Sequence, residues 1–366
     1  MYVDLWRWFR EYEHMAFVKD DASRRQLVTL AREGWRYREV ADADSAIRVF
    51  EQGVRLAEEY NEPCWVIFHK YWVAEMLFYL KHDYQATLDY TIRLTAECRK
   101  EIYDDCPVKS RVFFVLANIY YMIDFYGYEE KIIDVMDYVE DSVPMDEDTH
   151  LRLLHMRAQI DFDHQNYDVC EEKTLDMLNR SLNNAFRQRS GYHLLRAIAY
   201  ARGDIALASE YNEIANKYAK FIQIQRSIAE GKLWDAIYAL RLGEVDKAQT
   251  AYNDALEHYE YYDLAKEVTF HEVNSEYMEL LGKAEQAIEF RRALIEQVSS
   301  SASIYNQMLA HWNYCRILGR FGKPMETALA DARSLGAKSL NPSIYLQKLD
   351  EIEAGEYWEY AWQKED

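Results

Sequence analysis

Four glycines recur at an almost constant spacing in the second half of the chain, and this regularity constrains the fold more than any other feature. Gly203, Gly243, Gly282 and Gly322 are separated by 40, 39 and 40 residues. Each lies between two runs of helix-forming residues, where a glycine commonly ends a helix. A constant period of this length is typical of a chain built from stacked copies of one small structural unit.

Two columns of mostly small residues accompany the glycines through most of the chain, with six of eight small residues in the first column and seven of eight in the second. The second column stands five residues after each glycine and continues towards the N-terminus: Ala46, Thr87, Lys131, Cys170, Ala208, Ala248, Ala287 and Thr327. The first column lies twelve residues earlier, or fourteen in the third repeat: Gly34, Glu75, Ala117, Ala158, Arg196, Ala236, Ser275 and Cys315. Helices whose axes approach to about 8 Å need small residues where they cross. The columns therefore predict antiparallel helical hairpins that bury their apolar faces by stacking on one another.

This arrangement resembles the tetratricopeptide repeat (TPR), which has a small residue in its first helix, a turn, and an alanine early in its second helix. The stretch VLANIYYMIDFYGYEEKI, residues 115–132, carries the resemblance. The period near 40 exceeds the common 34 and is similar to the TPR regions of maltose-regulator-like activators and of Rap-type peptide receptors. The resemblance implies an all-α, right-handed solenoid of about eight hairpins over residues 28–335. A capping helix over residues 1–27 would precede it, and residues 336–366 would add a second capping helix and an acidic, aromatic tail.

Composition supports helices and disfavours two classes of partner. Only 5 prolines and 12 glycines interrupt 366 residues, which leaves little room for a many-stranded sheet. The formal net charge of −20 disfavours nucleic acids and anionic membrane surfaces, because both attract basic proteins. Residues 123–150 carry ten acidic residues and one lysine, and residues 349–366 carry seven and one. These segments are solvated faces or, alternatively, contact sites for a basic partner.

The sequence also bears on the compartment. No window of 18 apolar residues predicts a membrane span, and the first residues lack the apolar run of a signal peptide. The five cysteines form no CxxC pair. We therefore expect reduced, mostly buried thiols in a cytoplasmic protein.

No catalytic or metal-binding signature is evident. The segment GRFGKP, residues 319–324, lacks the spacing and the following serine or threonine of a phosphate-binding loop. Asp161, Asp163, His164 and Cys170 are close in sequence, but a predicted turn separates the cysteine from the other three, and metal ligands must converge on one point. We expect no enzymatic activity, no metal and no cofactor.

The TPR resemblance implies which side chains face the inner wall of the array. These positions lie three before the first small-residue column and one and four after it. They give the candidate peptide- or protein-binding residues Trp72, Tyr79, Phe114, Asn118, Tyr121, His155, Gln159, Phe162, His193, Tyr200, Glu272 and Glu276, while the sixth repeat gives Leu233, Ile237 and Leu240. Rings would supply contact area and polar groups would fix the register of a peptide. Glu272, Glu276 and Glu279 would form a carboxylate strip for a basic side chain. Aromatic residues at helical spacing fit a core equally well, and a shift of one residue would turn these rings between helices.

These observations favour a non-enzymatic scaffold that binds a protein segment or a peptide along its inner wall. In one alternative, the chain is a regulatory sensor in which a small peptide or metabolite changes the superhelix and controls a separate effector chain. In another, it is a structural assembly subunit that binds a basic partner through its acidic segments.

Overall fold

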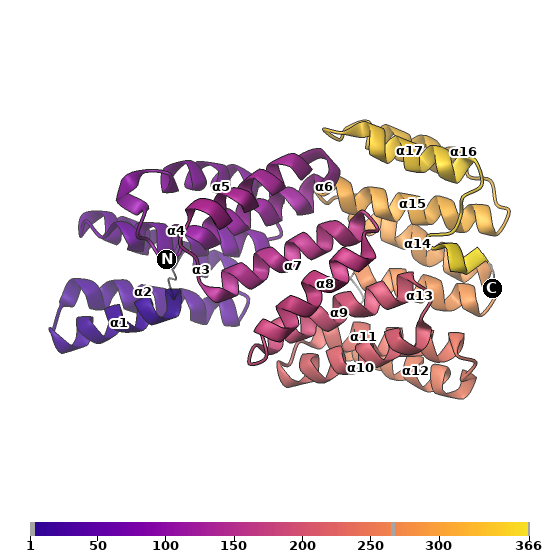
Figure 1. The fold of residues 1–366 in the computed structure, drawn as a ribbon, viewed down its shortest axis with the longest axis horizontal. Coiled ribbons are helices and arrows are strands. Elements are labelled where there is room, and N and C mark those ends of the chain that lie inside the picture. Colours follow the sequence, from indigo (N-terminus) through magenta and orange to yellow (C-terminus); the bar gives the residue numbers. More distant parts are fainter. Residues whose placement is uncertain (1–3, 265–267, 365–366) are drawn as a thin grey trace. The chain divides into compact units, whose positions relative to one another are not determined.

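The chain folds into helices joined by short turns (Figure 1). The computed structural model describes residues 4–264 and 268–364, and within these ranges every regular element is an α-helix or a short 3-10 helix, so the all-α prediction is confirmed. Among these residues, no helix combines the length and the apolar character that crossing a bilayer requires. The chain forms two compact units, Met1–Leu153 and Leu154–Asp366, and their boundary falls within the helix α7 (Glu147–Asp163).

The described residues of unit 1 form six complete α-helices, one short 3-10 helix and the beginning of a seventh α-helix. They are α1 (Leu5–Val18), α2 (Ala22–Glu39), α3 (Ala43–Glu59), α4 (Pro63–Tyr79), α5 (Tyr84–Cys98), the 3-10 helix η1 (Glu101–Tyr103), α6 (Lys109–Ser142) and the start of α7 (Glu147–Asp163). Each α-helix from α1 to α6 packs on the next α-helix in the chain, and η1 lies between α5 and α6 in sequence. In addition, α2 contacts α4, and α4 contacts α6. The first helices of neighbouring hairpins therefore lie side by side, as stacking requires.

Unit 2 continues the same alternation to the C-terminus. After the end of α7 it contains α8 (Tyr167–Arg180), α9 (Ala185–Ala201), α10 (Ile205–Phe221), α11 (Gln225–Arg241), α12 (Val245–Tyr261), α13 (Val268–Leu280), α14 (Ala284–Val298), α15 (Ile304–Arg320), α16 (Glu326–Gly336), α17 (Pro342–Glu353) and the 3-10 helix η2 (Ala361–Lys364). The pairs α9–α10, α11–α12, α13–α14 and α15–α16 are hairpins, and α11 also contacts α13 directly.

The small-residue columns lie where the helices of each hairpin meet. Four alanines on which the steric argument depends are all 0% exposed: Ala158, Ala208, Ala248 and Ala287. Gly34 shows how close the approach is, because a Cβ atom there would lie 2.4 Å from the ring of Phe50 in the paired helix α3. The predicted packing is therefore confirmed at these positions.

The second column is displaced by one residue in the third and eighth repeats. Lys131 and Thr327, the predicted members, are exposed, whereas the adjacent Ile132 and Ala328 are buried. The lysine was a visible departure from a column of small residues. Threonine gave no such sign, because it suits a buried or an exposed position.

The repeat glycines end helices in the left-handed backbone conformation. Their φ angles are 81° at Gly203, 78° at Gly243, 70° at Gly282 and 61° at Gly322. The equivalent positions in three earlier repeats have φ angles of 57° at Ala41, 51° at His82 and 61° at Gln165. The turn geometry thus persists where the glycine is lost, which is why the sequence signal fades towards the N-terminus.

The third hairpin is one helical element that folds back on itself. Within α6, Asp124 has non-helical angles of φ −156° and ψ 82°. Phe113 and Tyr138 would be about 38 Å apart along a straight helix, yet their ring centroids are 4.9 Å apart. The element therefore reverses at Asp124, whose carboxylate accepts a hydrogen bond from the backbone N–H of Gly127 at 3.2 Å and caps the second arm.

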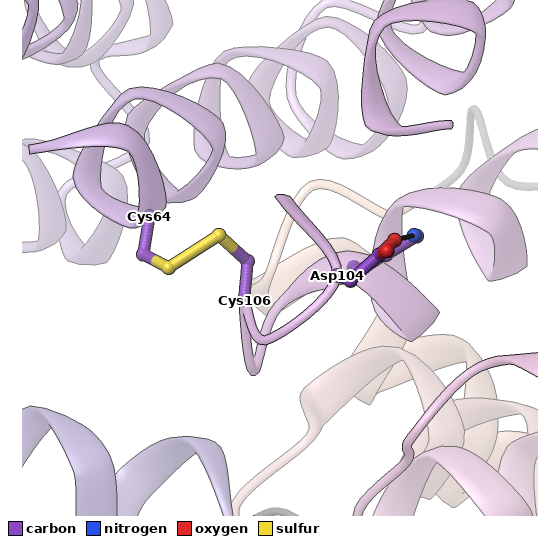
Figure 2. The surroundings of a disulfide bond; sticks show 4 residues. Cys64, Asp104 and Cys106 are labelled. Atoms are coloured by element: carbon purple, nitrogen blue, oxygen red, sulfur yellow. Dashed lines mark hydrogen bonds and ion pairs between the residues drawn. A yellow bond between two sulfur atoms is a disulfide. The ribbon is translucent and has the colours of Figure 1, made fainter. Parts of the chain in front are cut away.

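Cys64 and Cys106 form a disulfide bond, which corrects the expectation of five reduced thiols (Figure 2). Cys64 lies in the first turn of α4 and Cys106 follows η1, with Cα atoms 5.0 Å apart. An ion pair of 2.7 Å between Lys109 and Asp104 lies in the same segment. The other cysteines are free and buried: Cys98, Cys170 and Cys315. The bonded residues are 42 positions apart, so local cysteine spacing gave no sign of the bond. The cysteines consequently give no support to a reducing compartment.

Aromatic rings make up much of the core of unit 1. Trp65 and Phe68 of α4 are fully buried, with centroids 5.0 Å apart. α1 contributes Trp8 and Phe9, whose rings lie 5.2 and 5.7 Å from Trp65. The N-terminal helix therefore covers the aromatic face of α4.

Candidate functional site

Unit 2 contains a cavity of about 520 Å³ bounded by the first helices of successive hairpins and by the C-terminal tail, residues 354–364. The lining residues of α9 are His193, Arg196, Ala197 and Tyr200, and those of α13 are Thr269, Glu272, Val273 and Glu276. Spacings of three, four and seven place the residues of each helix on one face. α7, α11, α14 and α15 add further lining side chains, so residues distant in sequence meet at one point.

Three rings form one side of this cavity. The ring of Tyr200, on α9, lies 5.4 Å from Trp234 and 5.9 Å from Tyr238, both on α11. The hydroxyl of Tyr200 donates a hydrogen bond to Glu276. Burial, together with the charge of Glu276, raises the pKa of Tyr200 well above its ordinary value, so the hydroxyl keeps its proton. This wall combines apolar surface with a fixed hydrogen-bond donor.

A buried network centred on Arg196 forms the next part of the wall. Its guanidinium donates to Glu230 at 3.1 Å and to Asn212 at 3.0 Å, and lies 5.0 Å from the ring centroid of Trp234. His193 Nε2 is 3.2 Å from the same Glu230 oxygen. Burial and the charge of Arg196 lower the pKa of His193, so the imidazole is neutral near pH 7. Burial alone would raise the pKa of Glu230, but its contacts in this network lower it, and Arg196 keeps the carboxylate ionised.

The predicted carboxylate strip is not open to a basic ligand. Two of its members pair with arginines: Glu276 Oε1 with Arg241 Nη2 at 3.1 Å, and Glu279 Oε2 with Arg320 Nη2 at 2.7 Å. Glu272 is half-buried, and burial raises its pKa although the nearby Arg291 lowers it. Because neighbouring helices supply these guanidiniums, two of the three carboxylates of the strip, Glu276 and Glu279, are neutralised within the fold.

Arginines outnumber helix-borne carboxylates around the cavity and around an adjoining cavity of about 260 Å³. The arginine cluster consists of Arg196, Arg226, Arg241, Arg291, Arg316 and Arg320, and the helices contribute Glu230, Glu272, Glu276 and Glu279. Six positive and four negative formal charges leave an excess of two positive charges, in a chain whose net charge is −20. Arg291 Nε and Nη1 are buried without a hydrogen-bond partner among the described residues.

The C-terminal tail approaches the arginine cluster first through Tyr357 and Trp358. The ring of Tyr357 packs where a Cβ atom on Gly319 would come within 2.3 Å of it. Arg320 donates a hydrogen bond of 2.7 Å to the backbone carbonyl of Tyr357 and lies 4.8 Å from the ring centroid of Trp358. One arginine of α15 thus holds both Glu279 and the beginning of the tail.

The tail then reaches the aromatic wall. The ring of Tyr360 lies 6.0 Å from Tyr200, and Trp362 lies 5.3 Å from it, both edge-on. The guanidinium of Arg241 is 4.8 Å from the Trp362 ring centroid. A Cβ atom on Gly203 would lie 2.9 Å from Trp362, so the turn after α9 leaves space for this indole.

Five of the seven predicted site residues of unit 2 lie around the cavity. They are Phe162, His193, Tyr200, Glu272 and Glu276. His155 and Gln159, on α7, do not line it. On α9 and α13 the residues at the predicted positions His193, Tyr200, Glu272 and Glu276 line the cavity.

On α11 the register is shifted by one residue. The predicted Leu233 and Ile237 are buried in the core, and Trp234 and Tyr238 line the cavity instead. A hydrophobic pattern does not by itself separate these neighbours, because all four side chains are apolar or aromatic.

The predicted site residues of unit 1 do not line this cavity. Trp72 is 5% exposed and packs 5.9 Å from Phe50 and 5.5 Å from Trp35, and Phe114 is 8% exposed. These two rings belong to the core, as the alternative interpretation of the aromatic rows allowed. Tyr79 is 43% exposed, and Asn118 and Tyr121 are half-buried.

Sequence reasoning missed the arginine cluster. Arg196 interrupts a column of small residues, and that interruption was the available signal. Arg241 and Arg320 each lie at the end of a helix and fall outside the three predicted rows. The acidic, aromatic character of the tail is visible in the sequence, but the surface that the tail contacts depends on where α17 ends.

The acidic residues near Cys170 are engaged in other contacts. Asp161 pairs with Lys173, and Tyr305 donates a hydrogen bond of 2.9 Å to Asp163. Within residues 4–264 and 268–364, no group of three side chains is arranged to hold a metal ion.

Known proteins resemble this chain in structure rather than in sequence. No family model matches the chain, and no curated protein matches it in sequence. A Rap protein complexed with Competence and Sporulation Factor aligns with a TM-score of 0.57 and 13% identity, over 80% of this chain and 82% of that one. The TPR domain of P58(IPK) also has 13% identity, over 90% and 89% of the two chains, but its TM-score of 0.26 is too low to support an argument. The likeness to the Rap structure confirms a TPR-type fold and, at this identity, shows the fold alone.

Proposed function

We propose that unit 2 is a non-enzymatic module that binds a peptide, either free or as a segment of another protein, in the cavity between α9, α11, α13 and α15. The observation that carries this proposal is the C-terminal tail, because a non-helical segment of chain already lies there with its rings against Tyr200, Arg241 and Arg320. A surface that accepts one such segment has the shape and chemistry to accept another. The Rap structure, solved with Competence and Sporulation Factor, supports a binding function for this fold.

The chemistry of the wall fits recognition better than catalysis. Glu230 and Glu276 are engaged with arginines, and His193 is held neutral beside Arg196. Fixed ion pairs of this kind position donors and acceptors for a ligand. The half-buried ring of Trp234 supplies apolar area that can anchor a peptide side chain, and the buried ring of Tyr238 packs 5.6 Å from it.

A displayed library of random peptides, screened against the full-length protein, tests this function. We expect the recovered peptides to bind wild type in calorimetry and to bind Trp234→Ala about thirtyfold more weakly, the usual effect of removing an aromatic anchor. Tyr261→Ala is the matched control, because Tyr261 is 81% exposed and does not line the cavity. Circular dichroism would establish that both variants are folded.

The assembly-subunit alternative predicts the opposite pattern. In that case binding survives Trp234→Ala and is lost when charges are reversed at Glu129, Glu130 and Asp134. Recovery of no cavity-dependent peptide would reject the proposed function.

A further inference from the structure

We propose that the C-terminal tail occupies the unit 2 cavity in place of a ligand, and that this ligand is an aromatic peptide bearing a carboxylate that reaches Arg291. The inference rests on the proposed function and adds to it the class of ligand and the means of control. An external ligand could bind only after the tail has left the cavity, so the tail competes with the ligand for the same site.

The tail has the form of a bound peptide. It leaves α17 through Gly355, whose φ is 106°, and residues 356–360 are non-helical before the short turn of η2. Figure 1 shows this segment in yellow, returning from α17 along the orange helices of unit 2. Alternate aromatic residues make the contacts: Trp358 meets Arg320, Tyr360 meets Tyr200, and Trp362 meets both Tyr200 and Arg241.

The tail is held less firmly than the helices around it. Trp358 is 37% exposed, and Glu356 and Lys364 form an ion pair at the surface, where such pairs contribute little. The walls that the tail contacts, including Tyr200, are buried within the hairpins. The other three rings of the tail, Tyr357, Tyr360 and Trp362, are half-buried rather than fully buried. A short non-helical segment of this kind can detach without unfolding the unit that holds it.

Charge indicates which ligand would replace the tail. The arginine cluster exceeds the glutamates of the helices by two charges, so an acidic segment is favoured over a basic one. The tail brings one carboxylate to both cavities, that of Glu359. The charge of Glu359 nevertheless raises the pKa of the neighbouring Glu272, which is an unfavourable contact between like charges.

Arg291 gives the ligand a contact that the tail does not make. It lines both cavities, and its Nε and Nη1 have no hydrogen-bond partner among the described residues. A guanidinium matches the two oxygens of a carboxylate. A peptide that keeps the aromatic contacts and also places a carboxylate at Arg291 would therefore bind better than the tail.

The apparent affinity for any external ligand equals its affinity for the open cavity multiplied by the fraction of molecules whose tail is detached. If the tail is in place in about nine molecules of ten, opening the cavity strengthens binding about tenfold. The full-length variant Trp358→Ala/Trp362→Ala removes two anchors of the tail and leaves the helices unchanged. Tyr261→Ala is the control for loss of an aromatic side chain elsewhere in unit 2.

The probe is a fluorescein-labelled, C-terminally amidated peptide with the sequence of residues 356–364, EYWEYAWQK. We expect the double variant to bind it at least about tenfold more tightly than wild type in fluorescence anisotropy. Arg291→Gln in the opened background should leave the binding of this probe nearly unchanged, because the described residues of the tail make no hydrogen bond to Arg291 Nε or Nη1. Two further probes supply a carboxylate: one has glutamate at the position of Gln363, which lines both cavities with Arg291, and the other has a free C-terminal acid. A probe whose carboxylate reaches Arg291 should bind the opened variant about tenfold more tightly than the first probe and should lose this gain in Arg291→Gln.

Equal binding of the probe by wild type and the opened variant would overturn the proposal, as would insensitivity of both carboxylate probes to Arg291→Gln. Hydrogen exchange provides a second measurement on the unaltered chain: residues 354–364 should exchange faster when a library peptide is bound, and unchanged exchange would contradict displacement. If library peptides bind wild type and the opened variant equally through Trp234, the proposed function stands and the competitor role fails. If no peptide binds either protein, both fail.

Discussion

In unit 1 the rings of the first helices pack against one another, whereas in unit 2 they border a cavity. Trp65 and Phe68 are covered by α1 and fully buried. Tyr200 and Trp234 instead meet arginines and a tail that remains partly exposed. Both regions come from the same helical repeat, so rows of aromatic residues do not by themselves distinguish a core from a binding surface. Arginines lie beside rings in both units, as Arg38 beside Trp72 shows. The distinction is what covers the rings: the helix α1 packs on those of α4, whereas the non-helical tail lies against Tyr200 of α9.

The two ends of the chain show the same contrast. The N-terminal segment is an amphipathic helix, and its Leu5 and Phe9 are buried against unit 1. The C-terminal tail is largely non-helical and presents Trp358 at the surface. Stability is therefore expected to depend strongly on the N-terminal contacts and weakly on the C-terminal ones.

Removal of an aromatic side chain should lower the free energy of unfolding far more in unit 1 than in unit 2, and the loss in unit 1 is the largest effect that we expect. Trp65→Ala should lower the free energy of unfolding by about 3–5 kcal/mol, because it leaves a large buried hole. Trp358→Ala should cost less than about 1 kcal/mol, since its ring is partly exposed. Calorimetry of the two full-length variants measures both values, and similar losses would contradict the contrast.

The disulfide should stabilise unit 1 without affecting the cavity of unit 2. Replacing Cys64 and Cys106 together by serine should cost about 2–4 kcal/mol of unfolding free energy, because the unfolded chain loses a constraint. Chemical denaturation with and without reductant checks this value, and reductant should have no further effect on the variant. A change in peptide binding would show that the bond acts beyond unit 1.

His69 should make unit 1 sensitive to acid. Burial lowers the pKa of His69 to about 3, whereas an unfolded histidine titrates near pH 6.5. Between these values the unfolded state binds the additional proton, so the free energy of unfolding falls as pH drops below about 6.5. The loss is on the order of 2 kcal/mol at pH 5. His69→Leu should remove it, as measured by urea denaturation at pH 7 and pH 5, and an unchanged slope would refute this assignment.

Two glycines in unit 2 should respond differently to alanine. Gly243→Ala should cost about 1 kcal/mol, because its φ of 78° is left-handed although nothing lies within 4 Å of the added atom. Gly319→Ala places a Cβ against Tyr357, so the main effect should be release of the tail, with a helical gain of up to about 1 kcal/mol. Hydrogen exchange should accelerate in residues 354–364 for Gly319→Ala alone, and equal exchange in both variants would weaken the link between Gly319 and the tail.

The sequence predicted the helical hairpins because their packing depends on small residues at a fixed period. Ala208 and Ala248 occupy the predicted contacts, and Gly203 and Gly243 end the predicted helices. The period did not determine the register in every repeat, as the exposed Lys131 shows. One residue of error turns a helix by about 100°, which is enough to exchange a core position for a surface one.

The site was less predictable, because it depends on contacts between distant parts of the chain. Tyr200 and His193 followed from the TPR resemblance, but the partners of Glu276 and Glu279 come from other helices. The disulfide and the contacts between the tail and α9 likewise join residues that are distant in the sequence. Arg196 interrupts a small-residue column and forms a buried ion pair with Glu230, but Lys131 interrupts the other column and is exposed. The interruption alone therefore did not identify the contact.

The arginine cluster has a kinetic consequence for any acidic ligand. At an ionic strength of about 0.01 M, where the Debye length is about 30 Å, such a peptide experiences from a distance the repulsion of a chain with a net charge of −20. Only near the cavity do the guanidiniums attract it. Added salt should therefore speed the encounter by screening the outer field, while it weakens the contacts formed once the peptide has arrived.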